Sequence, residues 1–268
     1  FKTMNILITG GNGYIAKSLA NKVDNVPSIT RKDFDLTDRH ATNKWFEGKY
    51  FDVVIHTAIK GGSRLLVDGG NVFYENIQMF YNLLNNKHCF GKLINFGSGA
   101  ELGIPNNPYG LSKNIISRII DNEDNFYNIR IYGVFDENEL DTRFIKSNIK
   151  RYINRESIEV YQDKLMDFFY MEDLIRLVEY FIYKNNLPKN IDCSYSQHHS
   201  LSDVAYLINN LSDYKVKINI NSNEKGKDYI GDWNPLNIKW KGLKYGIDKT
   251  YDKLLEENHF KNQQAIIV

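Results

Sequence analysis

A tyrosine and a lysine four residues apart are the side chains of this sequence best suited to acid–base chemistry. Tyr109 and Lys113 lie in the segment PYGLSK, and this spacing places them on one face of a helix. A nearby ammonium group lowers the pKa of a phenol, so Tyr109 could exchange a proton near neutral pH. Ser98 follows the apolar run at residues 93–96, and its hydroxyl could hydrogen-bond the same substrate oxygen. We therefore predict Ser98, Tyr109 and Lys113 as the catalytic group.

A glycine-rich turn near the start of the chain could bind a phosphate group. The sequence TGGNGYIA follows the apolar run MNILIT and precedes a helical pattern. Gly10 permits a tight turn, and Gly13 lets backbone amides approach a pyrophosphate at the positive end of the helix. Ala16 is small enough for that helix to pack closely on the strand. Between a strand and a helix, this spacing is typical of a dinucleotide-binding loop.

The end of the second predicted strand bears on the choice of dinucleotide. An acid at this point commonly binds the ribose 2′-hydroxyl of NAD, whereas an arginine accommodates the 2′-phosphate of NADP. Here SIT leads into Arg31 and Lys32, and the first acid is Asp33. The two cations favour NADP and leave NAD possible, although both could also be solvated surface charges.

Short apolar runs alternate with helical patterns over the first 130 residues. This alternation predicts a Rossmann-like α/β fold, a doubly wound parallel sheet with helices on both faces. The apolar residues of the segment 71–85 cover more than one stripe, which fits either a core helix or a subunit interface. The expected strands are residues 4–9, 52–58, 92–96 and 127–132, and the expected helices are residues 14–23, 38–46, 71–85 and one that begins near Tyr109.

The second half of the chain has a looser pattern and is expected to form a smaller C-terminal substrate domain. We predict that residues 4–132 form the dinucleotide-binding domain and that residues 165–183 return to it. The substrate-binding part would then comprise residues 133–164 and 184–268. Its expected elements are helices at 142–154, 172–183, 202–211 and 249–257 and a strand at 158–161.

Composition excludes several classes of protein. A net charge of +1 over 268 residues argues against a nucleic-acid partner, and no apolar run is long enough to span a membrane. Cys89 and Cys193 lie far apart without a CxxC spacing, and His198 and His199 have no third ligand nearby in sequence, so we expect no metal site. Two isolated cysteines also suit a reducing compartment, and the first predicted strand leaves no room for a signal peptide. We therefore expect a cytoplasmic protein.

The segments TGGNGYIA, FGSGAELG and PYGLSK together resemble the extended short-chain dehydrogenases/reductases, the NAD-dependent epimerase/dehydratase family that acts on nucleotide sugars. Two further segments, AIKGG at residues 58–62 and MDFFYMED at residues 166–173, are similar to the GDP-fucose synthases of that family. The resemblance implies that Ser98, Tyr109 and Lys113 act as a triad and that Lys113 also holds the nicotinamide ribose.

The resemblance also implies contacts for the cofactor and the substrate. Arg31 matches a ligand of the 2′-phosphate, Tyr161 a residue that stacks near the base, and Arg151 a basic contact to the pyrophosphate. The implied substrate contacts are Ser98, Arg143, Arg151 and Tyr161. The implied cofactor contacts are Gly10, Gly13, Tyr14, Ile15, Arg31, Asp35, Leu36, Ala58, Lys60, Tyr109, Lys113, Ile131 and Tyr132.

Some residues depart from the family pattern around the reacting carbon. Where GDP-fucose synthases carry the cysteine and histidine needed for epimerisation, this chain has Ala100 and Arg143, and neither fits as the missing base or acid. Dehydratases place an Asp-Glu pair directly after the serine or threonine, where this chain has Gly99 and Ala100. Glu101 comes one step late and is expected to point to the other side of an extended strand.

One further departure concerns the diphosphate of the substrate. Met166 stands where relatives carry an arginine that contacts it. Nucleotide binding is therefore expected to depend on other cations, for which Arg151, Lys225 and Lys227 are the candidates.

These features predict a homodimeric enzyme that reduces a nucleotide-linked 4-keto-sugar with NADPH. An NAD-dependent nucleotide-sugar 4-epimerase with the same triad is the alternative. A second alternative is a non-catalytic regulator that binds the dinucleotide without turnover, although such proteins usually lose the tyrosine or the lysine, and Tyr109 and Lys113 are both present.

Overall fold

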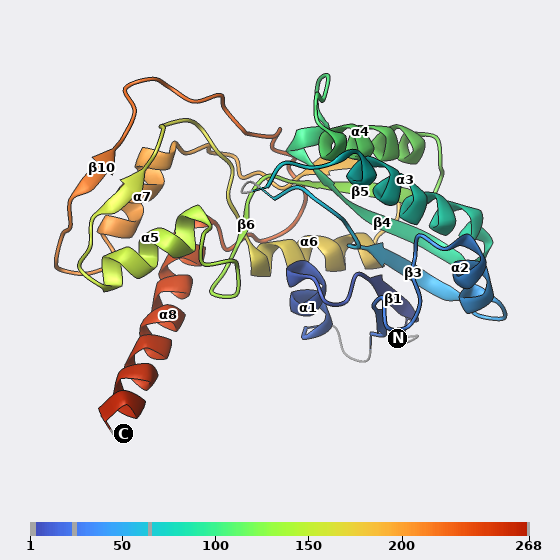
Figure 1. Ribbon diagram of the computed structural model, residues 1–268, viewed down its shortest axis with the longest axis horizontal. Helices are drawn as coiled ribbons and strands as arrows, with labels where there is room; N and C mark the ends of the chain where they lie inside the picture. The colour runs from blue at the N-terminus through green and yellow to red at the C-terminus, as the bar shows by residue number, and fades with distance from the viewer. Residues whose placement is uncertain (1–3, 23–25, 64–65, 267–268) are drawn as a thin grey trace. The chain divides into compact units, whose positions relative to one another are not determined.

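A six-stranded parallel sheet forms the centre of the first of two compact units (Figure 1). The computed structural model describes residues 4–22, 26–63 and 66–266. Most residues of the strands are buried, as a parallel sheet covered on both faces requires. In sheet order the strands are β2 (Ser28–Ile29), β1 (Ile6–Thr9), β3 (Phe51–His56), β4 (Phe90–Ser98), β5 (Phe126–Ile131) and β9 (Asn190–Asp192). This arrangement confirms the predicted Rossmann-like doubly wound sheet.

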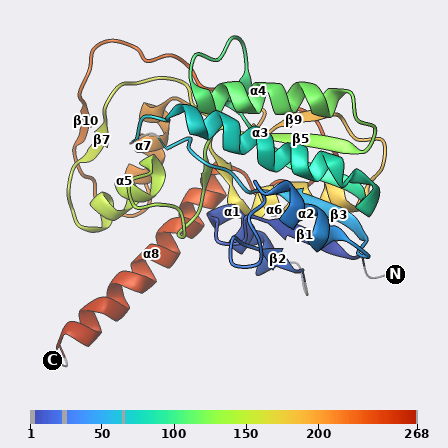
Figure 2. The same ribbon diagram turned by 45° about the vertical axis from the view of Figure 1, so that its right-hand side comes forward.

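Helices cover both faces of this sheet (Figures 1 and 2). The helices α2 (Arg39–Phe46), α3 (Gly70–Asn85) and α4 (Pro108–Asp121) share one apolar core with the strands. On the opposite face lie α1 (Tyr14–Ala20) and the part of α6 (Met171–Tyr183) that belongs to this unit. The predicted end of the first helix at Val23 lies outside the described residues. The crossovers bring the carboxyl ends of all six strands to one edge, where loops can form a site.

The second unit has its own core. The helices α5 (Phe144–Ile153) and α7 (Leu201–Asn209) and the start of α8 (Leu243–Ile266) pack around buried aromatic and aliphatic side chains, of which Tyr152 is the largest fully buried one. In two small parallel pairs, β7 (Ile158–Val160) pairs with β10 (Ile218–Ile220), and β6 (Val134–Phe135) pairs with β8 (Phe169–Tyr170). The helix α8 is longer at both ends than the predicted helix at 249–257.

The boundary between the units differs from the predicted one. The first unit runs to Ile131 and includes Leu177–Asp192, and the second comprises Tyr132–Arg176 and the residues from Cys193 onward. The returning segment therefore begins and ends later than the predicted 165–183. It extends to Asp192 because β9 pairs with β5, with Ile191 opposite Ile129. The assignment of cofactor binding to one unit and substrate binding to the other stays a prediction.

Within the described ranges, the helices offer no stretch that is both long and apolar enough to cross a membrane.

Candidate active site

The turn after β1 has the backbone conformation that a dinucleotide-binding loop needs. Gly10 has a φ of +76°, and a Cβ atom there would lie 2.7 Å from the Cα of Ala58. The N–H of Gly13 donates to the carbonyl of Gly10 at 2.8 Å, and Gly13 is the N-cap residue of α1. Because Gly13 has no side chain, the cap residue offers no side-chain acceptor to the N–H groups of the first helical turn. The sequence TGGNGYIA therefore folds as predicted from its glycines.

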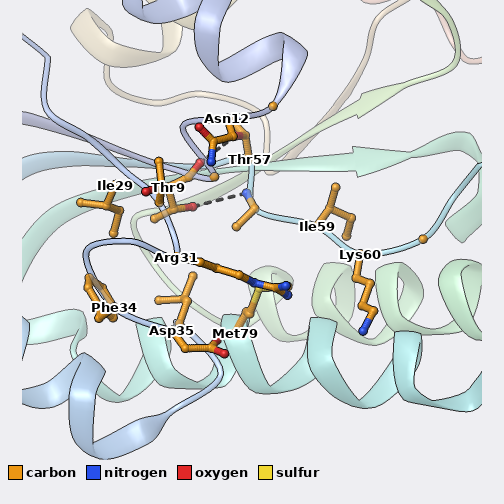
Figure 3. A pocket seen from close by; sticks show the side chains of 16 residues that line it. Thr9, Asn12, Ile29, Arg31, Phe34, Asp35, Thr57, Ile59, Lys60 and Met79 are labelled. Atoms are coloured by element: carbon orange, nitrogen blue, oxygen red, sulfur yellow. Dashed lines mark hydrogen bonds between the residues drawn. The ribbon is translucent and has the colours of Figure 1, made fainter. Parts of the chain in front are cut away.

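A cavity of about 470 Å³ lies beside this turn (Figure 3). It is lined by residues at the carboxyl ends of β1, β2 and β3. The strand β2 lies on one side of β1 and β3 lies on the other, so the strand order reverses between β1 and β3. Cofactors bind at such switch points in open α/β sheets, and the volume is in the range of small-molecule sites. The predicted cofactor contacts that line it are Gly10, Gly13, Arg31, Asp35, Leu36, Ala58 and Lys60.

Other predicted cofactor contacts lie outside the lining of this cavity. Tyr14 and Ile15 begin α1, and Ile131 ends β5 directly opposite Ser98. Tyr132 belongs to the second unit, where its ring packs against Tyr229 with ring centroids 5.1 Å apart. A cofactor role for these four residues stays a prediction.

Two cations and one carboxylate sit together at the cavity. The guanidinium of Arg31 lies 3.5 Å from the Glu75 carboxylate, and the ammonium of Lys60 forms an ion pair with the same carboxylate. Figure 3 shows Arg31 extending over Met79 toward the side of the cavity that carries Lys60. Sequence reasoning missed Glu75, although it is the one charged residue of α3 and this was a usable signal.

The acids near Arg31 are held by local contacts. The Asp33 carboxylate accepts the N–H of Thr30 at 2.7 Å, which lowers the pKa of Asp33. The Asp35 carboxylate accepts the N–H of Thr37 at 2.9 Å, and this contact is the main cause of the lowered pKa of Asp35. Asp33 is therefore engaged in its own turn, whereas Asp35 contributes an ionised carboxylate to the cavity wall.

The predicted catalytic residues lie on adjacent elements of the first unit. Ser98 ends β4 and begins the 3-10 helix η2 (Gly99–Glu101), and its Oγ accepts the N–H of Ala100 at 3.1 Å. Tyr109 and Lys113 lie in the first turns of α4, which begins with Pro108 and is capped by the Asn107 side chain. The Lys113 ammonium donates to the carbonyl of Phe96, two residues before Ser98. It lies 6.0 Å from the centre of the Tyr109 ring.

Burial sets the charge state of the groups around Lys113. Burial lowers the pKa of Lys113 to about 8, and the carboxylate of Glu101 opposes this effect. His56 in β3 is also buried, and burial together with the Lys113 charge lowers its pKa to about 3. His56 is therefore neutral, and its Nδ1 shares a hydrogen bond of 2.8 Å with the Thr9 hydroxyl. The charge of Lys113 therefore depends on the balance between burial, which lowers its pKa, and the Glu101 carboxylate, which raises it.

A buried asparagine links the cavity wall to the catalytic helix. Asn76 in α3 accepts the N–H of Lys60 at 2.9 Å and donates to the carbonyl of Lys60 at 3.0 Å. Its amide also donates to the hydroxyl of Ser112 in α4 at 3.1 Å. Nearby, a Cβ atom on Gly62 would lie 2.7 Å from the Tyr109 ring. Sequence reasoning missed Asn76, because α3 carries several polar residues and the sequence does not show which of them are buried.

The prediction for Glu101 was wrong. The backbone does not stay extended after Ser98 but turns through η2, so Glu101 folds back against the end of β4. Its side chain is 2% exposed, and its carboxylate accepts the N–H of Ser98 at 3.1 Å. Glu101 is therefore a buried acid in contact with the backbone of Ser98, the predicted catalytic serine.

The predicted substrate contacts of the second unit are spread over its surface. Arg143 occupies the N-cap position of α5, and its side chain makes no capping hydrogen bond. Arg151 lies in the last turn of the same helix, about 12 Å further along the axis. The guanidinium of Arg151 is 3.6 Å from Glu156, and Tyr161 is 80% exposed. The candidate cations Lys225 and Lys227 are exposed. A substrate role for these residues stays a prediction.

A histidine and a carboxylate form a pair that sequence reasoning did not predict, and its carboxylate belongs to the residue that follows Met166. His198 Nδ1 and the buried carboxylate of Asp167 are 2.8 Å apart. Among the residues that the structure describes, no three His, Cys, Asp or Glu side chains are grouped to hold a metal ion.

Comparisons with known proteins agree on a family and a fold. The NAD-dependent epimerase/dehydratase family matches residues 6–193. CDP-abequose synthase from Yersinia pseudotuberculosis is 22% identical over 246 residues, covering 80% of this chain and 87% of that protein.

Solved structures are similar over almost the whole chain. GDP-mannoheptose C4 reductase from Campylobacter jejuni with NADP bound has a TM-score of 0.80 at 17% identity, covering 95% of this chain and 99% of the other. UDP-glucose 4-epimerase from Thermotoga maritima with UDP-glucose has a TM-score of 0.77 at 16% identity, covering 95% and 99%. At these identities the likeness supports the fold and leaves the reaction open.

The close approach of Gly10 to Ala58 leads to a first prediction. In Gly10→Ala, the added Cβ meets backbone atoms at 2.7 Å and the residue keeps a left-handed φ, so the turn must move. We expect dinucleotide affinity to fall about fivefold to a hundredfold, since overpacking of this kind costs about 1–3 kcal/mol. Quenching of intrinsic fluorescence on titration with NADPH and NADH measures the affinity.

Gly48→Ala is the matched control. Gly48 has a φ of +71° and open space around its Cβ position, in the turn before β3 begins. It carries the same backbone strain of about 1–2 kcal/mol without the clash, so it should lower stability and leave affinity unchanged. Equal affinities in the wild type and Gly10→Ala would show that this turn does not hold the cofactor.

Proposed function

The chain belongs to the NAD-dependent epimerase/dehydratase family, and we propose that it reduces a nucleotide-linked 4-keto-sugar with NADPH. Membership rests on the family match over residues 6–193. It confirms the predicted family and the predicted class, an enzyme that depends on a nicotinamide dinucleotide. The reduction, the choice of NADPH and the substrate class are the proposal.

The observation that carries the proposal is the placement of Tyr109 and Lys113 beside Ser98. Bound NADPH would supply a hydride to the carbonyl carbon of the sugar. Tyr109 then donates its phenolic proton to the carbonyl oxygen, while the Ser98 hydroxyl hydrogen-bonds that oxygen and orients it. The ammonium of Lys113, held by the Phe96 carbonyl, stabilises the tyrosinate that remains. The three residues thus provide what carbonyl reduction requires of the protein.

Simple reduction accounts for the site better than epimerisation or dehydration. By the family resemblance, Ala100 and Arg143 occupy the places of the base and acid that invert a neighbouring carbon. Alanine carries no titratable group, and arginine stays protonated at any working pH. Similarity to a C4 reductase supports this reading. Similarity to a 4-epimerase keeps NAD-dependent epimerisation as the alternative. A regulator without turnover is disfavoured because Tyr109 and Lys113 are both in place.

The cations at the cavity favour NADPH over NADH. Arg31 and Lys60 both face the Glu75 carboxylate, so two positive groups already converge on one anion. The 2′-phosphate of NADP is an anion that they could bind in the same way. NAD remains possible, since Asp35 also lines the cavity and could accept a ribose hydroxyl.

We further propose that the enzyme is a homodimer in the cytoplasm. Tyr74 and Tyr81, seven residues apart on α3, are 64% and 50% exposed, and Leu111 on the neighbouring helix α4 is 40% exposed. A second copy of the chain is the occupant we propose for this apolar surface. The cytoplasm is supported by the sequence, in which Cys89 and Cys193 lie far apart without a CxxC spacing.

Cofactor choice is tested by reversing the charge at Arg31. In Arg31→Asp, a charge-assisted contact to the 2′-phosphate is lost and repulsion replaces it. We expect the Kd for NADPH to rise about tenfold to a hundredfold, with little change for NADH. Lys32→Asp is the control, because this neighbouring cation is exposed and lies outside the cavity lining. Equal losses for both cofactors in Arg31→Asp would refute the assignment.

The catalytic role of Tyr109 is tested by removing one oxygen atom. Tyr109→Phe loses the transferable proton, so we expect kcat to fall about a hundredfold to ten-thousandfold. Cofactor affinity should hardly change, whereas Lys113→Ala should reduce both. NADPH oxidation with a panel of GDP-, UDP-, dTDP- and CDP-linked 4-keto-sugars provides the assay. Full turnover of Tyr109→Phe would rule out this mechanism, and Tyr183→Phe, at an exposed tyrosine, controls for nonspecific effects.

Solvent deuterium distinguishes reduction from epimerisation. With no base at Ala100 or Arg143, a 4-keto-sugar reduced in deuterated water should gain no deuterium at C3 or C5. Mass spectrometry of the product measures the incorporation against an enzyme-free control. Deuterium at either carbon, at a rate comparable with reduction, would show that another residue removes a proton and that the enzyme also epimerises.

A further inference from the structure

Glu101 is a buried acid to which the proposed reaction gives no role. Its carboxylate accepts the N–H of Ser98 at 3.1 Å and the side-chain amide of Asn128 at 2.7 Å. The Nε atom of Arg130 lies 3.8 Å away. A Cβ atom on Gly97 would lie 2.6 Å from the Glu101 carboxylate, so only glycine at that position leaves room for this contact. Residues of both β4 and β5 therefore surround the Glu101 side chain.

The contacts are those of an ionised carboxylate. Within the described part of the chain, each group that contacts the Glu101 oxygens is a hydrogen-bond donor or a cation. A protonated acid would need an acceptor for its own proton. Burial raises the pKa of Glu101, and the Ser98 N–H, Lys113, Arg130 and Asn128 oppose that effect.

The charges around Glu101 balance when Lys113 is included. The guanidinium of Arg130 from β5 is 2.7 Å from Asp192 of β9 and 3.8 Å from Glu101. The ammonium of Lys113 and the carboxylate of Glu101 meet at the end of β4, where Lys113 donates to the carbonyl of Phe96 and Glu101 accepts the N–H of Ser98 two residues later. Since Asp192 is the nearer partner of Arg130, the charge of Glu101 is left to balance Lys113 from α4. The other titratable groups that face Lys113 are the neutral His56 from β3 and Tyr109 from its own helix. Without Glu101, the group would carry one uncompensated positive charge.

We propose that Glu101 is a positioning residue that keeps Lys113 protonated and fixes the backbone of Ser98 in the working enzyme. It acts on the reaction through these two residues and transfers no proton to the substrate. The inference rests on the proposed function only for the consequence in turnover. The electrostatic link between Glu101 and Lys113 can be measured without any sugar.

Glu101→Gln removes the charge and keeps the shape. In protein carrying lysine labelled with carbon-13 at Cε, the Lys113 signal is identified by its absence from Lys113→Met. We expect Lys113 to titrate about one to three pH units lower in Glu101→Gln than in the wild type. Because burial lowers the pKa of Lys113 to about 8, we expect the alkaline limb of the kcat–pH profile to move in the same direction.

Two further variants distinguish charge from packing. Glu101→Asp keeps the charge but shortens the side chain, so Lys113 should titrate near the wild-type pH. Glu123→Gln removes an acid 23% exposed just beyond α4 and should leave Lys113 unchanged. Equal lowering in Glu101→Asp and Glu101→Gln, or no lowering in either, would overturn the inference.

A reciprocal measurement covers the case in which Glu101→Gln does not fold. If Glu101 raises the pKa of Lys113, the charge of Lys113 must lower the pKa of Glu101 by the same free energy. Lys113→Met should therefore raise the titration of Glu101, followed with glutamate labelled at the carboxyl carbon. An unchanged Glu101 titration would overturn the inference. The expected shifts together with no turnover on any 4-keto-sugar would instead refute the proposed function and leave this inference standing.

Discussion

The need to bury the ammonium group of Lys113 constrains much of the first unit. An ammonium taken out of water is costly unless hydrogen bonds and a countercharge replace the water. The Phe96 carbonyl at the end of β4 supplies a hydrogen bond, and Glu101 supplies the countercharge. Both depend on where β4 stops pairing and turns into η2. The end of one strand therefore helps to fix α4, Ser98 and the charges of Lys113 and Glu101, the groups to which we assign catalysis.

The same requirement explains why polar side chains interrupt otherwise apolar elements. Asn128 sits in the buried strand β5, accepts from Asn95 at 2.7 Å and donates to Glu101. Asn76 sits on the buried side of α3 and bonds the loop at Lys60 to the helix that carries Tyr109. Each buried polar group finds its partner on a different element, so the elements cannot shift independently. The loop at Lys60, which lines the cavity, and the helix α4 are thus tied together within this unit.

The sequence was sufficient for the features that depend on local spacing. The strand–glycine–helix turn at Gly10, the placement of Tyr109 and Lys113 on one helix and the parallel sheet all follow from periodicity and turn chemistry. Features that depend on contacts across the fold were missed. Glu101 was placed on an extended strand because alternation gives no sign that a chain will turn into a 3-10 helix. Glu75 and Asn76 were missed because their partners are 15 to 44 residues away in sequence. The strand β9 is only three residues long, too short for a periodic pattern to be detected.

The predicted NADP site already contains a carboxylate of the protein. Glu75 pairs with both Arg31 and Lys60, so a 2′-phosphate bound as we propose would have to share these cations with Glu75 or displace it. The Arg31 contact is long at 3.5 Å and its side chain is 68% exposed, so redirecting the guanidinium costs little. Asn76 holds the backbone of Lys60, whose ammonium also forms an ion pair with Glu75. Arg31 has the weaker contact with Glu75, and we therefore expect discrimination between the two dinucleotides to depend mainly on Arg31.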